Sequence, residues 1–195
     1  MSYLDPKFII ETLGLIGIIS IVFAESGLFF GFFLPGDSLL FTAGLLASQG
    51  ILPFTPLLSL SILGAILGDT VGYIFGKKIG PKIFTKEDSL FFSQKNISRS
   101  RLFFDKYGPK AVILARFIPI VRTFTPILAG VGSMAYRRFV VYNCIGGILW
   151  VISMICGGFY FAKLIPNPDK YLLPVIIGII IISIIPALKE YFNKK

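Results

Sequence analysis

Four charged residues are conspicuous because each lies in a stretch that is otherwise apolar: Glu25, Asp37, Arg116 and Arg122. A charge at the centre of a membrane helix costs about 2.5 to 3.5 kcal/mol on insertion scales, so it needs a partner, a cavity or a function. Two converging guanidiniums would form a permanently charged receptor suited to phosphate oxygens. Carboxylates near them could exchange protons, because occupancy of an arginine alters how strongly a neighbouring acid holds its proton.

Proline and glycine interrupt both stretches that carry these charges. Pro35 and Gly36 directly precede Asp37, and Pro119 and Pro126 divide the second stretch. On an unbroken helix, residues six apart point about 120° away from each other. A break at Pro119 would instead let the two arginines converge on one site, whereas the alternative is that they snorkel to the interface.

The remaining sequence predicts an all-α integral membrane protein. Hydrophobic residues make up 55% of the 195 residues and charged residues only 15%, and the mean hydropathy is +0.82. The helical segments on either side of each break have about ten residues and reach about 15 Å, or half the thickness of a bilayer. This length favours re-entrant hairpins at the breaks. We expect one polytopic domain over residues 1–195, with hairpins at about 25–50 and 111–136 and transmembrane helices at about 8–24, 54–76, 139–162 and 171–188.

The charge distribution gives an orientation. The loop 77–110 holds nine Lys/Arg against three acids and is therefore expected in the cytoplasm. Both termini are then cytoplasmic, the first hairpin enters from outside and the second from inside. Each half reads as a re-entrant hairpin followed by a transmembrane helix, which is an inverted repeat flanked by N- and C-terminal transmembrane helices.

Sequence support for the repeat is limited to a few identical residues, which are found when the sequence is compared with itself at an offset of 86 residues. This shift matches Ala43-Gly44 with Ala129-Gly130, Gly72 with Gly158, and Lys77 with Lys163.

Asp69 is a further acid in an apolar segment. Glycines recur every four residues around it, at Gly64, Gly68, Gly72 and Gly76, and predict a helix-packing surface. Asp69 itself could serve a proton path or hydrogen-bond a neighbouring helix, and the sequence leaves both readings open. Asn143 and Trp150 are interpreted as packing residues.

Several classes of protein are disfavoured. The chain has no histidine, which excludes His-dependent phosphatases, paired-histidine zinc proteases and Ser-His-Asp hydrolases, so we expect no enzyme, metal or cofactor. The net charge of +9 lies mostly in loops and indicates topology rather than a nucleic-acid partner.

Three motifs in order resemble the DedA family, also called SNARE-associated or VTT-domain proteins: ESGLFFGFFLPGD at 25–37, GDTVGY at 68–73 and RFIPIVRTFTPILAG at 116–130. The resemblance implies a multi-pass protein of the bacterial inner membrane that supports membrane homeostasis dependent on the proton-motive force. By similarity, Glu25 and Asp37 match the family's essential acids, and Arg116 and Arg122 its essential arginines.

The expected function is a flippase for undecaprenyl phosphate, a polyprenyl lipid that carries cell-wall precursors. Arg116 and Arg122 would bind the phosphate, and Glu25, Asp37 and Asp69 would handle protons or another coupling cation. The expected partners are this lipid phosphate and the surrounding membrane lipids, with a homo-oligomer left open. The alternatives are a phospholipid scramblase or phosphatidylethanolamine flippase, and a proton-coupled antiporter for small cations or drugs.

Overall fold

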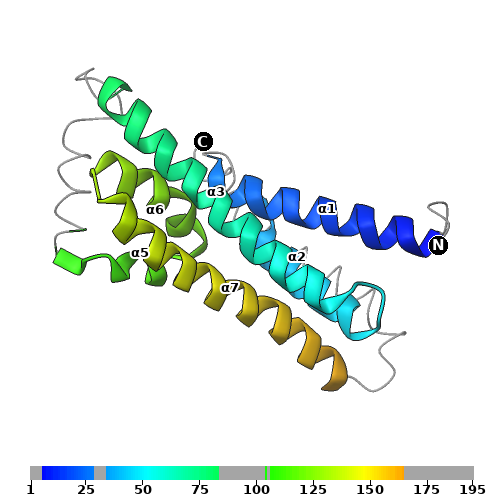
Figure 1. The fold of residues 1–195 in the computed structure, drawn as a ribbon. Helices are drawn as coiled ribbons and strands as arrows, with labels where there is room; N and C mark the ends of the chain where they lie inside the picture. Colours follow the sequence, from blue (N-terminus) through cyan, green and yellow to red (C-terminus); the bar gives the residue numbers. More distant parts are fainter. Residues whose placement is uncertain (1–5, 29–33, 84–103, 105, 165–195) are drawn as a thin grey trace, which may run out of the picture. The chain divides into compact units, whose positions relative to one another are not determined.

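The computed structural model describes residues 6–28, 34–83, 104 and 106–164, and every regular element in these ranges is an α-helix. The helices follow one another along the chain as coloured in Figure 1: α1 (Pro6–Gly27), α2 (Gly36–Ser48), α3 (Phe54–Ile83), α5 (Lys110–Ala115), α6 (Pro119–Val131) and α7 (Tyr136–Leu164). The all-helical prediction is confirmed for the described part of the chain. The last predicted transmembrane helix, 171–188, lies outside it.

Two helices are long and apolar enough to cross a bilayer. They are Phe54–Lys78 within α3 and Tyr136–Leu164, with mean hydropathies of 1.7 and 2.0. Many of their large apolar side chains, such as Leu67 and Leu149, are exposed, as expected of helices in contact with lipid. Helix α3 continues past the predicted end at residue 76, so the start of the predicted basic loop is helical.

The first predicted break is bounded by helix ends. Helix α1 ends at Gly27, so Glu25 lies in its last turn and not at the start of a separate hairpin. Helix α2 begins at Gly36, with Pro35 as its N-cap residue and Asp37 in its first turn. An acid is favourable there because the first turn of a helix carries unpaired N–H groups and a partial positive charge.

The second break lies between α5 and α6. The short helix α5 ends at Ala115, and Ile118 is extended, as is usual for a residue before proline. Pro119 is the first residue of α6, where its missing N–H costs nothing. Pro126, in contrast, was wrongly predicted as a break: α6 continues through it, because one lost backbone bond is tolerated in a helix held by its neighbours.

The chain divides into two compact units. The α2 unit comprises Met1–Ile21, Phe33–Ser61 and Val151–Lys195, and contains α2 with the C-terminal part of α7. The α6 unit comprises Val22–Phe32 and Ile62–Trp150, and contains α5 and α6 with most of α3 and the first half of α7.

Glycine brings α2 close to α7 in the α2 unit. A Cβ added to Gly44 would lie 2.2 Å from the carbonyl oxygen of Ile155, and one added to Gly158 would lie 1.9 Å from that of Phe41. Both distances are far too short for a real side chain, so only glycine allows this contact. Aromatic pairs flank it, with Phe41 and Phe161 at 5.7 Å between ring centroids.

The same kind of glycine contact joins α6 to α3 in the α6 unit, and Figure 1 shows α6 against α3. A Cβ on Gly130 would lie 2.2 Å from the carbonyl oxygen of Tyr73, and one on Gly76 would lie 2.1 Å from that of Ile127. Each unit thus holds one half-length helix against one long helix by a reciprocal pair of glycine–carbonyl contacts.

These contacts define the internal repeat more accurately than the sequence matches. Gly44 and Phe41 correspond to Gly130 and Ile127, which confirms the shift of 86 for the short helices. The long helices are related by 82 instead: Gly158 corresponds to Gly76, and α3 and α7 begin at residues 54 and 136. The predicted matches of Gly72 with Gly158 and Lys77 with Lys163 are therefore wrong, because the contact glycine of the short helix precedes the start of the following long helix by ten residues in the first half and by six in the second.

The partners are also exchanged between the halves. The first short helix, α2, contacts the second long helix, α7, and the second short helix, α6, contacts the first long helix, α3.

Candidate functional site

The α6 unit buries four charged side chains contributed by different segments. Glu25 comes from the end of α1, Asp69 from α3, Arg116 from the break before α6, and Arg122 from α6 itself. Their exposed fractions are 3, 4, 4 and 8% respectively. The arginines therefore do not snorkel out of the protein, and their burial requires counter-charges within the fold.

The counter-charges form two ion pairs. The Arg122 Nη2 donates to Glu25 Oε1, and the Arg116 Nη2 donates to Asp69 Oδ2. Sequence reasoning placed Asp37 beside Glu25, with Asp69 left between two readings. In the structure Asp69 is the partner of Arg116. Asp37 belongs to the α2 unit, where its side chain is half-buried.

The backbone break changes the direction of the chain between the two arginines. The N–H of Arg116 donates to Ile113 O at 3.2 Å and that of Ile118 to Ala115 O at 3.0 Å, which are tight turns at the end of α5. The N–H of Arg122 then bonds Ile118 O at 3.0 Å as α6 begins. This irregular backbone lets side chains six residues apart approach one site.

Trp150 on α7 shows that the arginines do converge. The guanidinium carbon of Arg122 lies 4.5 Å from the centroid of the indole ring, and that of Arg116 lies 6.0 Å from it. The ring is 1% exposed. An indole face attracts cations through its quadrupole, and the attraction is stronger in a desolvated site, so Trp150 helps to hold both charges.

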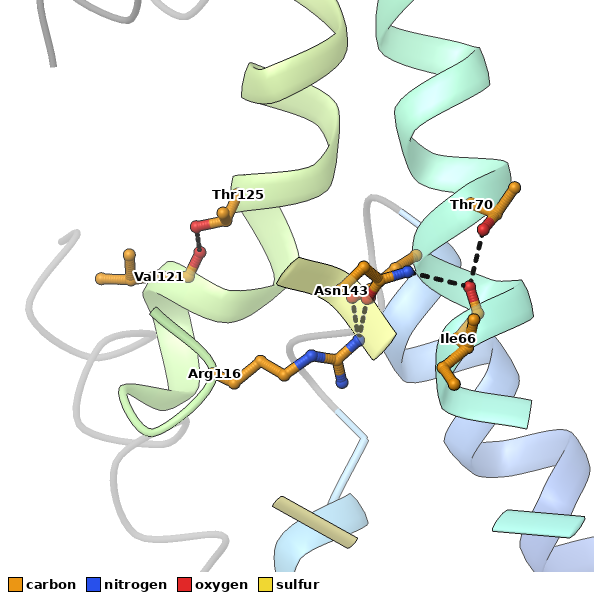
Figure 2. A network of polar contacts seen from close by, with 7 residues as sticks. Ile66, Thr70, Arg116, Val121, Thr125 and Asn143 are labelled. Carbon is orange, nitrogen blue, oxygen red and sulfur yellow. Dashed lines mark hydrogen bonds and ion pairs between the residues drawn. The ribbon is translucent and has the colours of Figure 1, made fainter. Parts of the chain in front are cut away.

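Asn143 links Arg116 to the two long helices (Figure 2). Its Oδ1 accepts a hydrogen bond from Arg116 Nη2 at 2.5 Å, and its Nδ2 donates to the carbonyl oxygen of Ile66 at 3.2 Å. The same carbonyl accepts a bond from the Thr70 hydroxyl at 2.8 Å. Asn143 is fully buried, and this network fixes the position of the Arg116 guanidinium between α3 and α7.

Two consecutive glycines of α7 make room for the Arg116 side chain. A Cβ on Gly146 would lie 3.0 Å from Arg116 Cδ, and one on Gly147 would lie 3.6 Å from Arg116 Cζ. The guanidinium can therefore lie directly on the α7 backbone. Its Nε has no hydrogen-bond partner among the described residues, which leaves one buried donor available.

Another glycine pair brings the end of α1 against α3. A Cβ on Gly27 would lie 2.7 Å from Gly68 O, and one on Gly68 would lie 2.6 Å from Phe23 O. Glu25 and Asp69 are adjacent to these contact points in the sequence. The predicted glycine surface on α3 is confirmed for Gly68, Gly72 and Gly76: Gly68 contacts α1, Gly76 contacts α6, and Gly72 contacts both.

Within the described part of the α6 unit, the site contains two guanidiniums and two carboxylates, and the formal charges of these four groups cancel. A buried ion pair gains little net stability, but loss of one partner is expensive because an uncompensated charge stays behind. An anion that reached the arginines would therefore have to replace a carboxylate, and the displaced carboxylate would be stabilised by taking up a proton. The arrangement is suited to coupled binding of an anion and protons.

Sequence reasoning missed Asn143 and Trp150, which it treated as packing residues. Asn143 is a polar residue in an apolar helix, and the cost of burying its amide without partners was a usable signal. Trp150 gave no comparable signal, because an indole in a membrane helix is ordinary.

The comparisons with known proteins agree with one another. Residues 34–160 match the model of the VTT domain. The chain is 44% identical to Protein DedA of Escherichia coli K12 over 90% of this chain and 80% of that protein. It is 42% identical to an uncharacterized membrane protein of Mycobacterium leprae, over 96% and 84% of the two chains. It is 35% identical to Inner membrane protein YghB of Escherichia coli K12, over 77% and 68%. No solved structure matches the chain.

Proposed function

The chain belongs to the DedA family of membrane proteins, whose members carry the VTT domain, and from this premise we propose that it moves a lipid phosphate across the membrane together with protons. The observation that carries the proposal is the buried quartet of Glu25, Asp69, Arg116 and Arg122, in which each guanidinium is matched by one carboxylate.

The coupling of phosphate to protons follows from charge balance. When the phosphate oxygens bind an arginine, the carboxylate that leaves it takes up a proton, so the site stays neutral in both states. A phosphate monoester carries about −1.5 to −2 charges near neutral pH. Two arginine–carboxylate pairs match that charge, with one proton taken up for each negative charge bound.

The substrate we propose is undecaprenyl phosphate, moved in the bacterial inner membrane for recycling of the carrier. Its head group would contact the arginines while the polyprenyl tail stays in lipid. The proposed topology has cytoplasmic termini and re-entrant hairpins that bring α2 and α6 into the membrane from opposite sides. In this topology Asp37 would be a third proton-handling acid, beside Glu25 and Asp69.

Binding of the lipid phosphate can be tested through the fluorescence of Trp150. The chain has one tryptophan, and it contacts both guanidiniums. Addition of a short-chain polyprenyl phosphate to the purified protein should change the Trp150 emission in a saturable way. Arg122→Gln should abolish the response, and Arg137→Gln, which removes an exposed arginine of α7, should leave it unchanged. An identical response in all three proteins would refute binding at the arginines.

Transport is tested in proteoliposomes with a fluorescent polyprenyl phosphate whose outer-leaflet fraction is destroyed by dithionite. A pH gradient should accelerate the flip in wild-type vesicles, and Arg116→Gln should remove the acceleration. Equal rates for phosphatidylethanolamine, without response to the gradient, would identify a scramblase instead. Acidification driven by a small cation in the absence of lipid phosphate would identify an antiporter.

A further inference from the structure

The α6 unit has a second polar feature that the arginine site does not use. A pocket of about 730 Å³ is lined by Tyr73, Ile74, Lys77 and Lys78 of α3 and by Tyr136 at the start of α7. Lys78 ends the apolar part of α3, and this is where a helix of this composition is expected to leave the hydrocarbon. Single lysines and tyrosines are common at this depth, but here two of each line one hollow.

We propose that this pocket binds the phosphate-monoester head group of a lipid. The lysines occupy consecutive positions, and each lies on the same side of α3 as Ile74 because residues three and four apart are neighbours on a helix. Both side chains are exposed, and within the described ranges neither has a carboxylate partner. Two ammonium groups beside apolar and aromatic walls fit an anionic head group attached to an apolar chain.

The tyrosine wall of the pocket is rigid. The Tyr73 hydroxyl donates to Met134 O at 2.5 Å, and its ring stacks on Phe139 with 4.6 Å between centroids. The Tyr136 ring lies 5.5 Å from that of Tyr73 and is 43% exposed. Amphipathic rings at a membrane interface contact both acyl chains and head groups. The pocket is therefore formed before a lipid arrives.

The pocket and the arginine site share one helix. Tyr73 is four residues from Asp69 and Lys77 is eight, which corresponds to about 6 Å and 12 Å along the axis of α3. The pocket would thus hold the head group before or after it contacts the arginines, on the side that the basic loop 77–110 assigns to the cytoplasm. This transport role rests on the proposed function, whereas lipid binding in the pocket does not.

The experiment uses the full chain in lipid nanodiscs that contain a diazirine-labelled lipid, followed by mass spectrometry of the labelled peptides. Diazirine-labelled phosphatidic acid should label the peptides around Tyr73 and Tyr136 about tenfold more than labelled phosphatidylcholine does, since each lysine near the surface adds appreciable affinity for an anionic lipid. The pair Lys77→Gln and Lys78→Gln should remove this preference. The matched pair Arg137→Gln and Arg138→Gln, which does not line the pocket, should keep it.

Three results would overturn the proposal: equal labelling by the two lipids, an undiminished preference in the lysine variant, or protection by millimolar inorganic phosphate as strong as by unlabelled phosphatidic acid. The last result would show a site for free phosphate. Failure of the proposed function is seen separately, because it would abolish the Trp150 response of the wild-type protein and leave the labelling of the pocket intact.

Discussion

Loss of one member of the Arg116–Asp69 pair should destabilise the protein more than loss of both. The two side chains are 4 and 5% exposed, so the charge that remains in either single variant has little access to water. Breaking a buried pair costs about 3 to 5 kcal/mol for this reason. Arg116→Gln also removes the donor to Asn143, which adds about 1 kcal/mol if the amide oxygen finds no other donor.

The double variant Arg116→Gln/Asp69→Asn replaces the ions by two amides that can bond each other. Its cost should be below that of either single variant, so it should fall short of the sum of the two single costs by at least about 3 kcal/mol. A change of 1 kcal/mol shifts the melting temperature of a chain of this size by about 2 to 4 °C. Each single variant should therefore lower the melting temperature by about 6 to 20 °C, with partial recovery in the double variant.

The assay is thermal unfolding of the purified variants in one detergent, followed by size-exclusion chromatography after heating. Arg138→Gln, at an exposed position of α7, serves as the control and should melt like the wild type. Strict additivity of the two single effects, within about 0.5 kcal/mol, would refute the pairing, because independent sites add to that accuracy.

Three further predictions concern contacts on which the fold and the site depend. Gly130→Ala places a Cβ 2.2 Å from Tyr73 O and should lower the melting temperature by several degrees, whereas Gly17→Ala, with no atom within 4 Å, should not. Tyr73→Phe removes the hydrogen bond to Met134 O and should cost about 1 kcal/mol in unfolding free energy, measured by denaturation in mixed micelles. Trp150→Leu removes the ring beside the guanidiniums and should weaken lipid-phosphate binding several-fold in a pull-down with immobilised ligand, and unchanged binding would contradict a role for the indole.

Much of the site follows from the cost of burying charge. That cost singles out Glu25, Arg116 and Arg122 in the sequence alone, and all three are buried and paired in the fold. The role of Asp69 as partner of Arg116 could not be derived in this way. It depends on which helices touch, and those contacts are set by glycines such as Gly68, whose partners lie more than forty residues away in the sequence.

The limits of prediction for the fold are also physical. Apolar length located α3 and α7, since a span must match the thickness of the bilayer. Proline alone was ambiguous: Pro119 begins a helix and Pro126 lies inside the same one, because position relative to the first turn decides whether the missing N–H matters. The two repeat shifts, 86 and 82, could be separated only by contacts between backbones.

The exchanged arrangement of the repeats has a consequence for biosynthesis. Gly44 of α2 meets Ile155 of α7, so the translocon releases the first short helix about 110 residues before its permanent neighbour is made. At about 5 to 20 residues per second, the ribosome takes on the order of 5 to 20 s to supply that neighbour. During this interval α2 must contact the insertion machinery or another protein in place of α7. Truncated nascent chains that stop before α7 should accordingly be degraded faster than full-length chains.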